Sequence, residues 1–210
     1  MKYLRNENIV HENLDDPSIT NQRREIIFQK AFLKKIYLDW YRYQLKNLPK
    51  GRILEVGSGA GFLKDLAPHV ITSDILACEG LDLIMDAHQL PFEESTLDGI
   101  VLTNVLHHLK NSREFFKEAS RCVRNNGMII MNEPWSTWWS QIIYKLFHHE
   151  PFNTESKSWS FPSSGPLSGA NGALPWIIFK RDINTFRKEF PEWKIQAIVP
   201  HMPFSYLISG

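Results

Sequence analysis

The sequence has few cysteines, almost no net charge and no long apolar run. Only Cys78 and Cys122 occur in 210 residues, without metal-type spacing, so neither a disulfide framework nor a cysteine zinc site is expected. The formal net charge is +1 and no cluster of lysine and arginine occurs, so we expect no nucleic-acid partner. No apolar stretch reaches the roughly 20 residues that a bilayer-spanning helix needs.

The remaining composition is that of an ordinary globular protein. Hydrophobic residues make up 43% of the chain, which is enough for one domain with a sizeable core. The first seven residues are polar and charged, unlike a secretory signal, and we expect a cytoplasmic protein with reduced thiols. A small molecule is the expected binding partner. Peripheral membrane contact and the oligomeric state are left open.

The most informative segment is 52–61, a short apolar strand that runs into a glycine turn. Its glycines are Gly57, Gly59 and Gly61. Such a turn lets backbone amides and a helix start approach a ligand closely, which indicates a nucleotide-like cofactor. A dinucleotide-binding turn would need glycine where Phe62 stands, and the acidic Glu55 would suit a cation better than a pyrophosphate.

Further strand-like runs follow the glycine turn. The run 69–75 contains Asp74 at its end, where an acid can accept both hydroxyls of a ribose. Three more apolar runs lie at 81–85, 97–103 and 127–134, and a helix is expected from Asn111 to Val123 between the last two. Strands that alternate with helices predict a parallel sheet with helices on both faces. The connection at 76–80 is too short for a crossover helix.

The order of these motifs over residues 52–134 resembles the class I S-adenosylmethionine-dependent methyltransferases, in their small-molecule branch. Their first motif is an acidic residue followed by Gly-x-Gly-x-Gly, as at Glu55 and the glycines after it. The resemblance implies an α/β, doubly wound, mostly parallel seven-stranded sheet with an antiparallel last strand. It also implies S-adenosylmethionine as cofactor and S-adenosylhomocysteine as product. The cofactor-binding residues that it implies are Glu55, Gly57, Ser58, Gly59, Gly61, Asp74, Asp86, Ala87, His88 and Asn104.

The implied reaction is in-line methyl transfer to a small, partly apolar acceptor, which could be lipid-like or sugar-like. Because the sulfonium already activates the methyl group, alignment alone can supply about 7 kcal/mol or more of barrier reduction. A hydroxyl or amine acceptor also needs a base that takes its proton. The candidates are His107, His108, Glu133, His148, His149 and His201.

We predict His108 and Glu133 as the catalytic residues, because both follow strands at the carboxyl edge of the sheet, where doubly wound folds bind ligands. No metal site is predicted. The run 148–150, His-His-Glu, has no partner ligands at metal-binding spacing.

The ends of the chain are more individual. Residues 1–48 are expected to form an N-terminal helical extension or cap, with one or two helices between 18 and 48. The Rossmann-like domain would span 49–210, with a substrate-side insertion at about 135–181. In that insertion we expect a tryptophan-rich helix and then an ordered loop over the pocket at 150–175. A helix at 182–190 and a hairpin of strands at 193–199 and 204–208 would complete the fold.

Three other functions remain compatible with these patterns. One is an NAD(P)-dependent oxidoreductase, which Glu55 and Phe62 disfavour. Another is a catalytically inactive, cofactor-binding regulatory protein, because methyl transfer requires no indispensable side chain whose loss would show. The third is a peripheral membrane protein that uses the tryptophan-rich helix.

Overall fold

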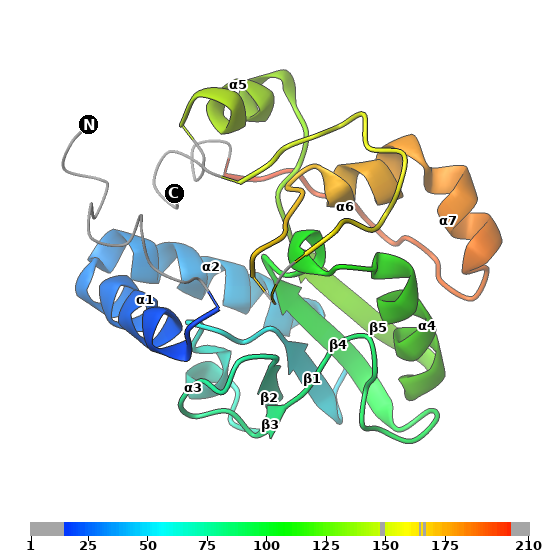
Figure 1. The fold of residues 1–210 in the computed structure, drawn as a ribbon. Helices are drawn as coiled ribbons and strands as arrows, with labels where there is room; N and C mark the ends of the chain where they lie inside the picture. The colour runs from blue at the N-terminus through cyan, green and yellow to red at the C-terminus, as the bar shows by residue number, and fades with distance from the viewer. Residues whose placement is uncertain (1–14, 148–149, 164, 166, 203–210) are drawn as a thin grey trace.

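The computed structural model describes residues 15–147, 150–163, 165 and 167–202. Its centre is a sheet of five parallel strands in the order β3-β2-β1-β4-β5 (Figure 1). The strands are β1 (Ile53–Val56), β2 (Ile71–Asp74), β3 (Leu83–Ile84), β4 (Leu97–Thr103) and β5 (Val123–Asn132). The first strand, β1, lies in the middle of the sheet. The strands β2 and β3 follow on one side of it, and β4 and β5 lie on the other side. This order confirms the predicted doubly wound α/β fold.

The predicted count of seven strands is wrong for the described residues. Residues 193–199 form no strand, and the predicted antiparallel strand at 204–208 lies outside the described residues. Apolar residues of 193–199 pack on the core instead of pairing as a strand. Trp193 and Ile195 lie against the core, and Trp193 Nε1 donates to Ser120 Oγ at 2.7 Å. This segment and β5 line the same cavity.

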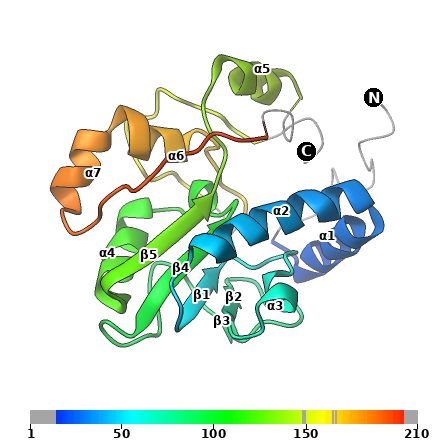
Figure 2. The same ribbon diagram turned by 180° about the vertical axis from the view of Figure 1, so that it is seen from behind.

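Helices cover both faces of the sheet, as predicted. Two helices precede it, α1 (Pro17–Gln29) and α2 (Ala31–Asn47), and they lie together beside its carboxyl end (Figure 2). The carboxylate of Asp16 caps α1 by accepting from Ser18 N at 2.9 Å, and the extended backbone of Lys30 separates the two helices. The chain between 18 and 48 is therefore two helices.

The core has two parts, one on each face, because successive side chains of a strand point to opposite sides. On one face Ile53 and Val101 pack against Tyr41 of α2 and against α3 (Leu63–Leu66). On the other face Leu54 and Ile100 pack against α4 and the segments after it. These segments are α4 (Ser112–Cys122), α6 (Leu174–Trp176), η2 (Ile177–Arg181) and α7 (Ile183–Glu189).

The remaining elements stand over the carboxyl edge of the sheet. They are the short helix η1 (Leu106–His108), which follows β4, and α5 (Trp138–Phe147), the predicted tryptophan-rich helix. Trp138 of α5 is 75% exposed. None of the helices in the described part of the chain is long and apolar enough to cross a membrane.

The loop after α5 contains a buried anchor. Trp159 is 1% exposed, its Nε1 donates to Asp182 Oδ2 at 2.9 Å, and the guanidinium of Arg113 stacks 4.2 Å from its ring centre. The backbone here bonds to the start of α4 and the chain just before it, because Ser112 N donates to Trp159 O and Phe161 N donates to Lys110 O. This part of the loop is integral to the core.

We predict that Trp159→Ala lowers the free energy of unfolding by about 3–5 kcal/mol, because it empties a buried site and removes the hydrogen bond from the indole to Asp182. Chemical denaturation followed by circular dichroism measures the change. The matched control is Trp138→Ala at an exposed tryptophan, for which we expect a change within about 0.5 kcal/mol. Equal effects of the two substitutions would show that the loop is not part of the folded core.

Candidate functional site

The glycine turn lies between β1 and α3, and its backbone requires glycine. Gly57 and Gly59 have φ angles of +67° and +44°, in the left-handed region that side chains disfavour. Gly61 meets a different constraint, because a Cβ there would collide with the hydroxyl of Tyr41 from α2. The turn therefore follows the end of β1 closely and leaves room for α2 beside it.

Glu55 lies on β1 just before this turn and is 2% exposed. Ser58 Oγ donates to Glu55 Oε2 at 2.7 Å and accepts from Ser73 N at 3.1 Å. Burial raises the pKa of Glu55 to about 7, although the hydrogen bond from Ser58 acts in the opposite direction. Near neutral pH this carboxyl group is easily ionised by a cation placed beside it.

Asp74 ends β2 on the other side of the turn. Its Oδ2 accepts from Gly59 N at 2.8 Å, and its Oδ1 accepts from Leu76 N at 2.9 Å. Burial raises the pKa of this carboxyl group, and the backbone hydrogen bonds from Leu76 and Gly59 oppose the shift. Asp74 thus ties the glycine turn to the neighbouring strand and stands at the carboxyl edge of the sheet.

The next predicted group, at 86–88, lies after β3. Asp86 is exposed and accepts from His88 N at 2.9 Å, while its Oδ1 is 2.5 Å from His88 Nδ1. His88 Nε2 accepts from Asn111 N at 3.1 Å, and Ala87 between them is buried. The group is therefore held against the start of α4.

Asn104 follows β4 with a φ angle of +58°, a backbone conformation that asparagine tolerates better than most residues. Its backbone N–H donates to Asn132 O at 2.8 Å, which extends the pairing of β4 with β5 to the edge of the sheet. This backbone conformation directs the chain into η1, which carries both histidines of the site.

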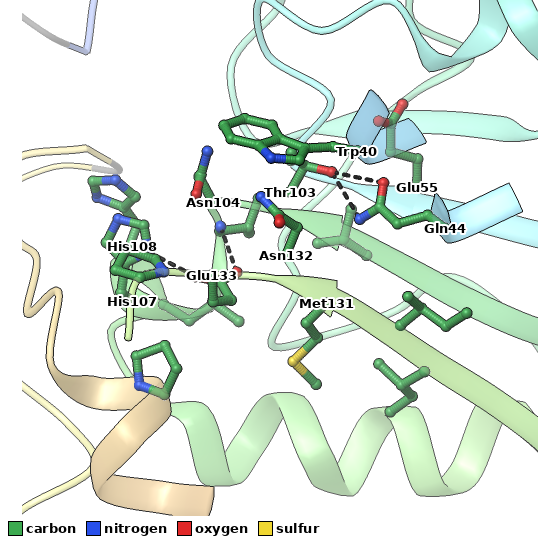
Figure 3. A pocket seen from close by; sticks show the side chains of 18 of the residues that line it. Trp40, Gln44, Glu55, Thr103, Asn104, His107, His108, Met131, Asn132 and Glu133 are labelled. Atoms are coloured by element: carbon green, nitrogen blue, oxygen red, sulfur yellow. Dashed lines mark hydrogen bonds and ion pairs between the residues drawn. The ribbon is translucent and has the colours of Figure 1, made fainter. Parts of the chain in front are cut away.

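One cavity of about 1990 Å³ connects these features at the carboxyl edge of the sheet. All ten residues predicted to bind the cofactor line it. The helix α2 adds Trp40 and Gln44, which sequence reasoning missed because neither residue belongs to a recognisable motif (Figure 3). The structure thus gathers the predicted set around one space, while the role of each residue stays a prediction.

Glu133, one of the two predicted catalytic residues, is almost fully buried at the end of β5. Its Oε1 accepts from Val105 N at 2.8 Å and Leu106 N at 2.7 Å, and its Oε2 accepts from His107 Nδ1 at 2.7 Å (Figure 3). Both oxygens are therefore engaged. The geometry favours a role in which Glu133 holds η1 and orients His107, and its predicted role as base stays untested.

His107 and His108 lie side by side with their ring centres 4.2 Å apart, and Glu150 lies next to both (Figure 3 shows the two rings). Burial lowers the pKa of His107, but the carboxylates of Glu133 and Glu150 outweigh it and raise that pKa to about 9. Burial and the charge of His107 lower the pKa of His108 to about 4. His108 is thus neutral at physiological pH.

Three other histidines were candidate bases. His201 lines the same cavity, and burial lowers its pKa. His148 and His149 lie outside the described residues. Glu150 lies beside both histidines of η1, a proximity that no spacing in the sequence indicated.

The position of Glu150 depends on Asn171, a buried residue that no sequence signal marked. Asn171 N donates to His107 O at 2.9 Å, and its side chain bonds to the backbone of Asn153 in both directions, at 2.9 and 3.0 Å. Gly172 N donates to Pro151 O at 2.9 Å. The chain beside Glu150 is therefore attached to η1.

The strand order, the glycine turn and the acids at successive strand ends are those of a Rossmann-like α/β domain. Residues 54–131 match the family model described as "Methyltransferase domain". This part of the chain is therefore similar to methyltransferase domains, as the sequence motifs predicted.

Individual proteins are similar to parts of this chain. A protein of Methanocaldococcus jannaschii that is described as uncharacterised is 29% identical over 96 residues, which cover 41% of this chain and 46% of that protein. The match thus spans about half of the relative's length. The structure is also similar to a methyltransferase of Thermotoga maritima, described as a possible histamine N-methyltransferase, with a TM-score of 0.52 and 17% identity over 81% of this chain and 79% of that one. This likeness shows the fold.

A second similar structure comes from Methanococcus maripaludis and is described as a candidate S-adenosyl-L-methionine-dependent methyltransferase. Its TM-score is 0.47, with 18% identity, over 58% of this chain and 66% of that chain.

We predict that the wild type becomes less stable as pH rises because Glu55 ionises, and that Glu55→Gln lacks this part of the pH dependence. The folded-state pKa of about 7 lies above the ordinary 4.5, so the fold favours the protonated carboxyl group. The contribution of Glu55 to the free energy of unfolding is therefore fully present below about pH 4.5. It is lost as pH rises through 7, and the total loss is about 3 kcal/mol. Urea denaturation between pH 5 and 8 measures this slope. A wild-type slope that persists in Glu55→Gln would contradict the assignment.

Proposed function

We propose that this protein transfers a methyl group from S-adenosylmethionine to a small, partly apolar acceptor. The observation that carries the proposal is the convergence of the glycine turn, Glu55 and Asp74 on one cavity at the carboxyl edge of the sheet. Parallel sheets of this winding bind their ligands at that edge. The match of residues 54–131 to the methyltransferase family identifies the cofactor that this edge would hold.

The charges around the turn suit this cofactor better than a dinucleotide. S-adenosylmethionine has a cationic amino-acid part and an adenosine part. We assign the cation to the neighbourhood of Glu55, whose carboxyl group is ready to ionise, and the ribose hydroxyls to Asp74. A pyrophosphate would instead face two acids here.

The reaction needs little beyond alignment. The acceptor atom attacks the methyl carbon in line, the carbon–sulfur bond breaks, and its electron pair returns to sulfur, which leaves S-adenosylhomocysteine. If the acceptor is a hydroxyl or an amine, its proton must leave as well. We assign the loss of this proton to the end of β4, where His107, His108 and Glu150 line the cavity.

We also propose that α1 and α2 form a cap on the cofactor side, and that the segment of about 135–181 forms the acceptor side. Trp40 and Gln44 of α2 line the cavity from one direction, and Trp139 and Glu150 line it from the other. The mixture of aromatic and charged side chains supports an acceptor with an apolar body and a polar reacting group.

We predict micromolar binding of S-adenosylmethionine and S-adenosylhomocysteine, and no binding of NADH, in isothermal titration calorimetry. Asp74→Ala should weaken binding of both cofactor forms at least tenfold, about 1.4 kcal/mol, because it removes the acceptor for the ribose hydroxyls. Asp65→Ala is the control, since Asp65 is an exposed acid on nearby α3, and it should leave affinity unchanged.

Two outcomes of these titrations would contradict the proposal. Binding of NADH alone would assign the site to an oxidoreductase. Binding of neither class of ligand would indicate a regulatory protein that keeps the fold without the cofactor. Normal affinity in Asp74→Ala would reject only the ribose assignment.

Trp40 offers a second test of the cap. Its side chain is buried, and its indole Nε1 has no hydrogen-bond partner among the described residues (Figure 3). A buried indole N–H usually has an acceptor, and a carboxylate of the bound cofactor would supply one. Trp40→Phe should therefore lower cofactor affinity about three- to tenfold, the usual worth of one hydrogen bond.

The same substitution at the exposed Trp138 is the matched control for Trp40→Phe, and we expect it to bind the cofactor like the wild type. Melting temperatures of both variants should be recorded before the titrations. Equal affinity of the wild type and Trp40→Phe would show that this indole does not contact the cofactor.

A further inference from the structure

Two histidines and one glutamate bring side-chain nitrogen and oxygen atoms close to one point. His107 Nε2 lies 3.6 Å from Glu150 Oε2, and His108 Nε2 lies 3.6 Å from Glu150 Oε1. Within the described part of the chain, the ligand atoms of these three residues all lie within 4.8 Å of one another. They come from η1 and from the segment after α5, so the tertiary fold assembles the group.

These separations are also close to those between two ligands of one metal ion. Two ligand atoms each about 2.0 Å from a tetrahedral zinc ion are about 3.3 Å apart. Only small movements would therefore bring all three side chains onto one ion.

The opposite nitrogen of each imidazole is held in the manner of metal-binding histidines. His107 Nδ1 bonds to the carboxylate of Glu133 at 2.7 Å, and His108 Nδ1 lies 3.4 Å from Gly169 O. A histidine that binds a metal through one nitrogen commonly donates the N–H of the other to a carboxylate or a backbone carbonyl, which fixes its tautomer. Both rings thus direct Nε2 toward Glu150.

The third ligand is held in place as well. Asn171 joins the backbone of Asn153 to that of His107, and Gly172 bonds to Pro151, directly after Glu150. The carboxylate is 20% exposed and His107 is only 3% exposed, so the group is closed on the protein side. All three residues line the same cavity as the glycine turn, so the group is accessible from that cavity.

We propose that His107, His108 and Glu150 bind a divalent transition-metal ion, with an open coordination position that faces the cavity. Two imidazoles and one carboxylate form a ligand set of catalytic zinc sites, which also keep one position open for water or substrate. The site needs no cysteine and no motif of adjacent ligands. For this reason the sequence did not show it.

The open position suggests which acceptors the site would take, and this step rests on the proposed methyl transfer. An acceptor oxygen bound to the ion loses its proton to water more readily, because the ion lowers the pKa of its ligand. The lone pair of that oxygen then forms the new bond to the methyl carbon, and the sulfonium becomes a thioether. The acceptor class is thus a small molecule with a hydroxyl group, and the ion takes the role predicted for His108.

The test is a titration of the full chain with zinc after exhaustive treatment with a chelator. We expect one zinc ion per chain with micromolar or tighter affinity in calorimetry. Cobalt bound at the same site should give a visible absorption band that zinc abolishes. His108→Ala and Glu150→Gln should each weaken zinc binding at least tenfold.

The control is His69→Asn, which removes an exposed histidine and should bind zinc like the wild type. Melting temperatures decide whether either ligand variant is folded, and one folded variant is sufficient for the comparison. Absence of stoichiometric zinc binding by the wild type would overturn the proposal. Unchanged affinity in the folded ligand variants would overturn it as well.

A parallel titration with S-adenosylmethionine separates this site from the proposed function. Zinc binding without cofactor binding would support the metal site and reject methyl transfer. Cofactor binding without zinc binding would reject the metal site alone.

Discussion

The parallel pairing of β1 with both β2 and β4 determines where everything else in the site lies. In a parallel sheet the carboxyl ends of all strands meet at one edge, so the residues that follow β1, β2, β4 and β5 become neighbours. Glu55, Asp74, Asn104 and Glu133 come from four strands and reach the same cavity for this reason. The backbone hydrogen bonds of the sheet thus bring residues from separate parts of the sequence into one site.

Buried acids give this edge its chemical character. The carboxylate of Glu133 accepts hydrogen bonds from two backbone amides and is bonded to one imidazole, so its position is closely defined. Glu55 accepts a hydrogen bond from the hydroxyl of Ser58, but burial outweighs this bond and raises the pKa of Glu55. The contrast separates a carboxylate that holds the structure from one that can respond to a cationic ligand. Sequence alone did not distinguish these two roles.

The sequence predicted the central fold well because its signals are local. Short apolar runs, the glycine turn and the acids at strand ends indicate a doubly wound sheet without any knowledge of distant contacts. The prediction of strands at 193–199 and 204–208 relied on the same local signals. The first is wrong because Trp193 and Ile195 are recruited by the core beside α4, a contact between segments about 70 residues apart.

The sequence by itself determined the winding of the chain, the glycine turn and the set of residues around the predicted cofactor cavity. These depend on residue type and on spacing along one strand and the turn after it. Only the tertiary structure decided that Trp40 from α2 and Glu150 from beyond α5 reach the cavity. Glu150 meets His107 and His108 across about 40 residues because Asn171 and Gly172 join the intervening chain to η1. Such long-range hydrogen bonds have no local pattern, so they become visible only when the chain is folded.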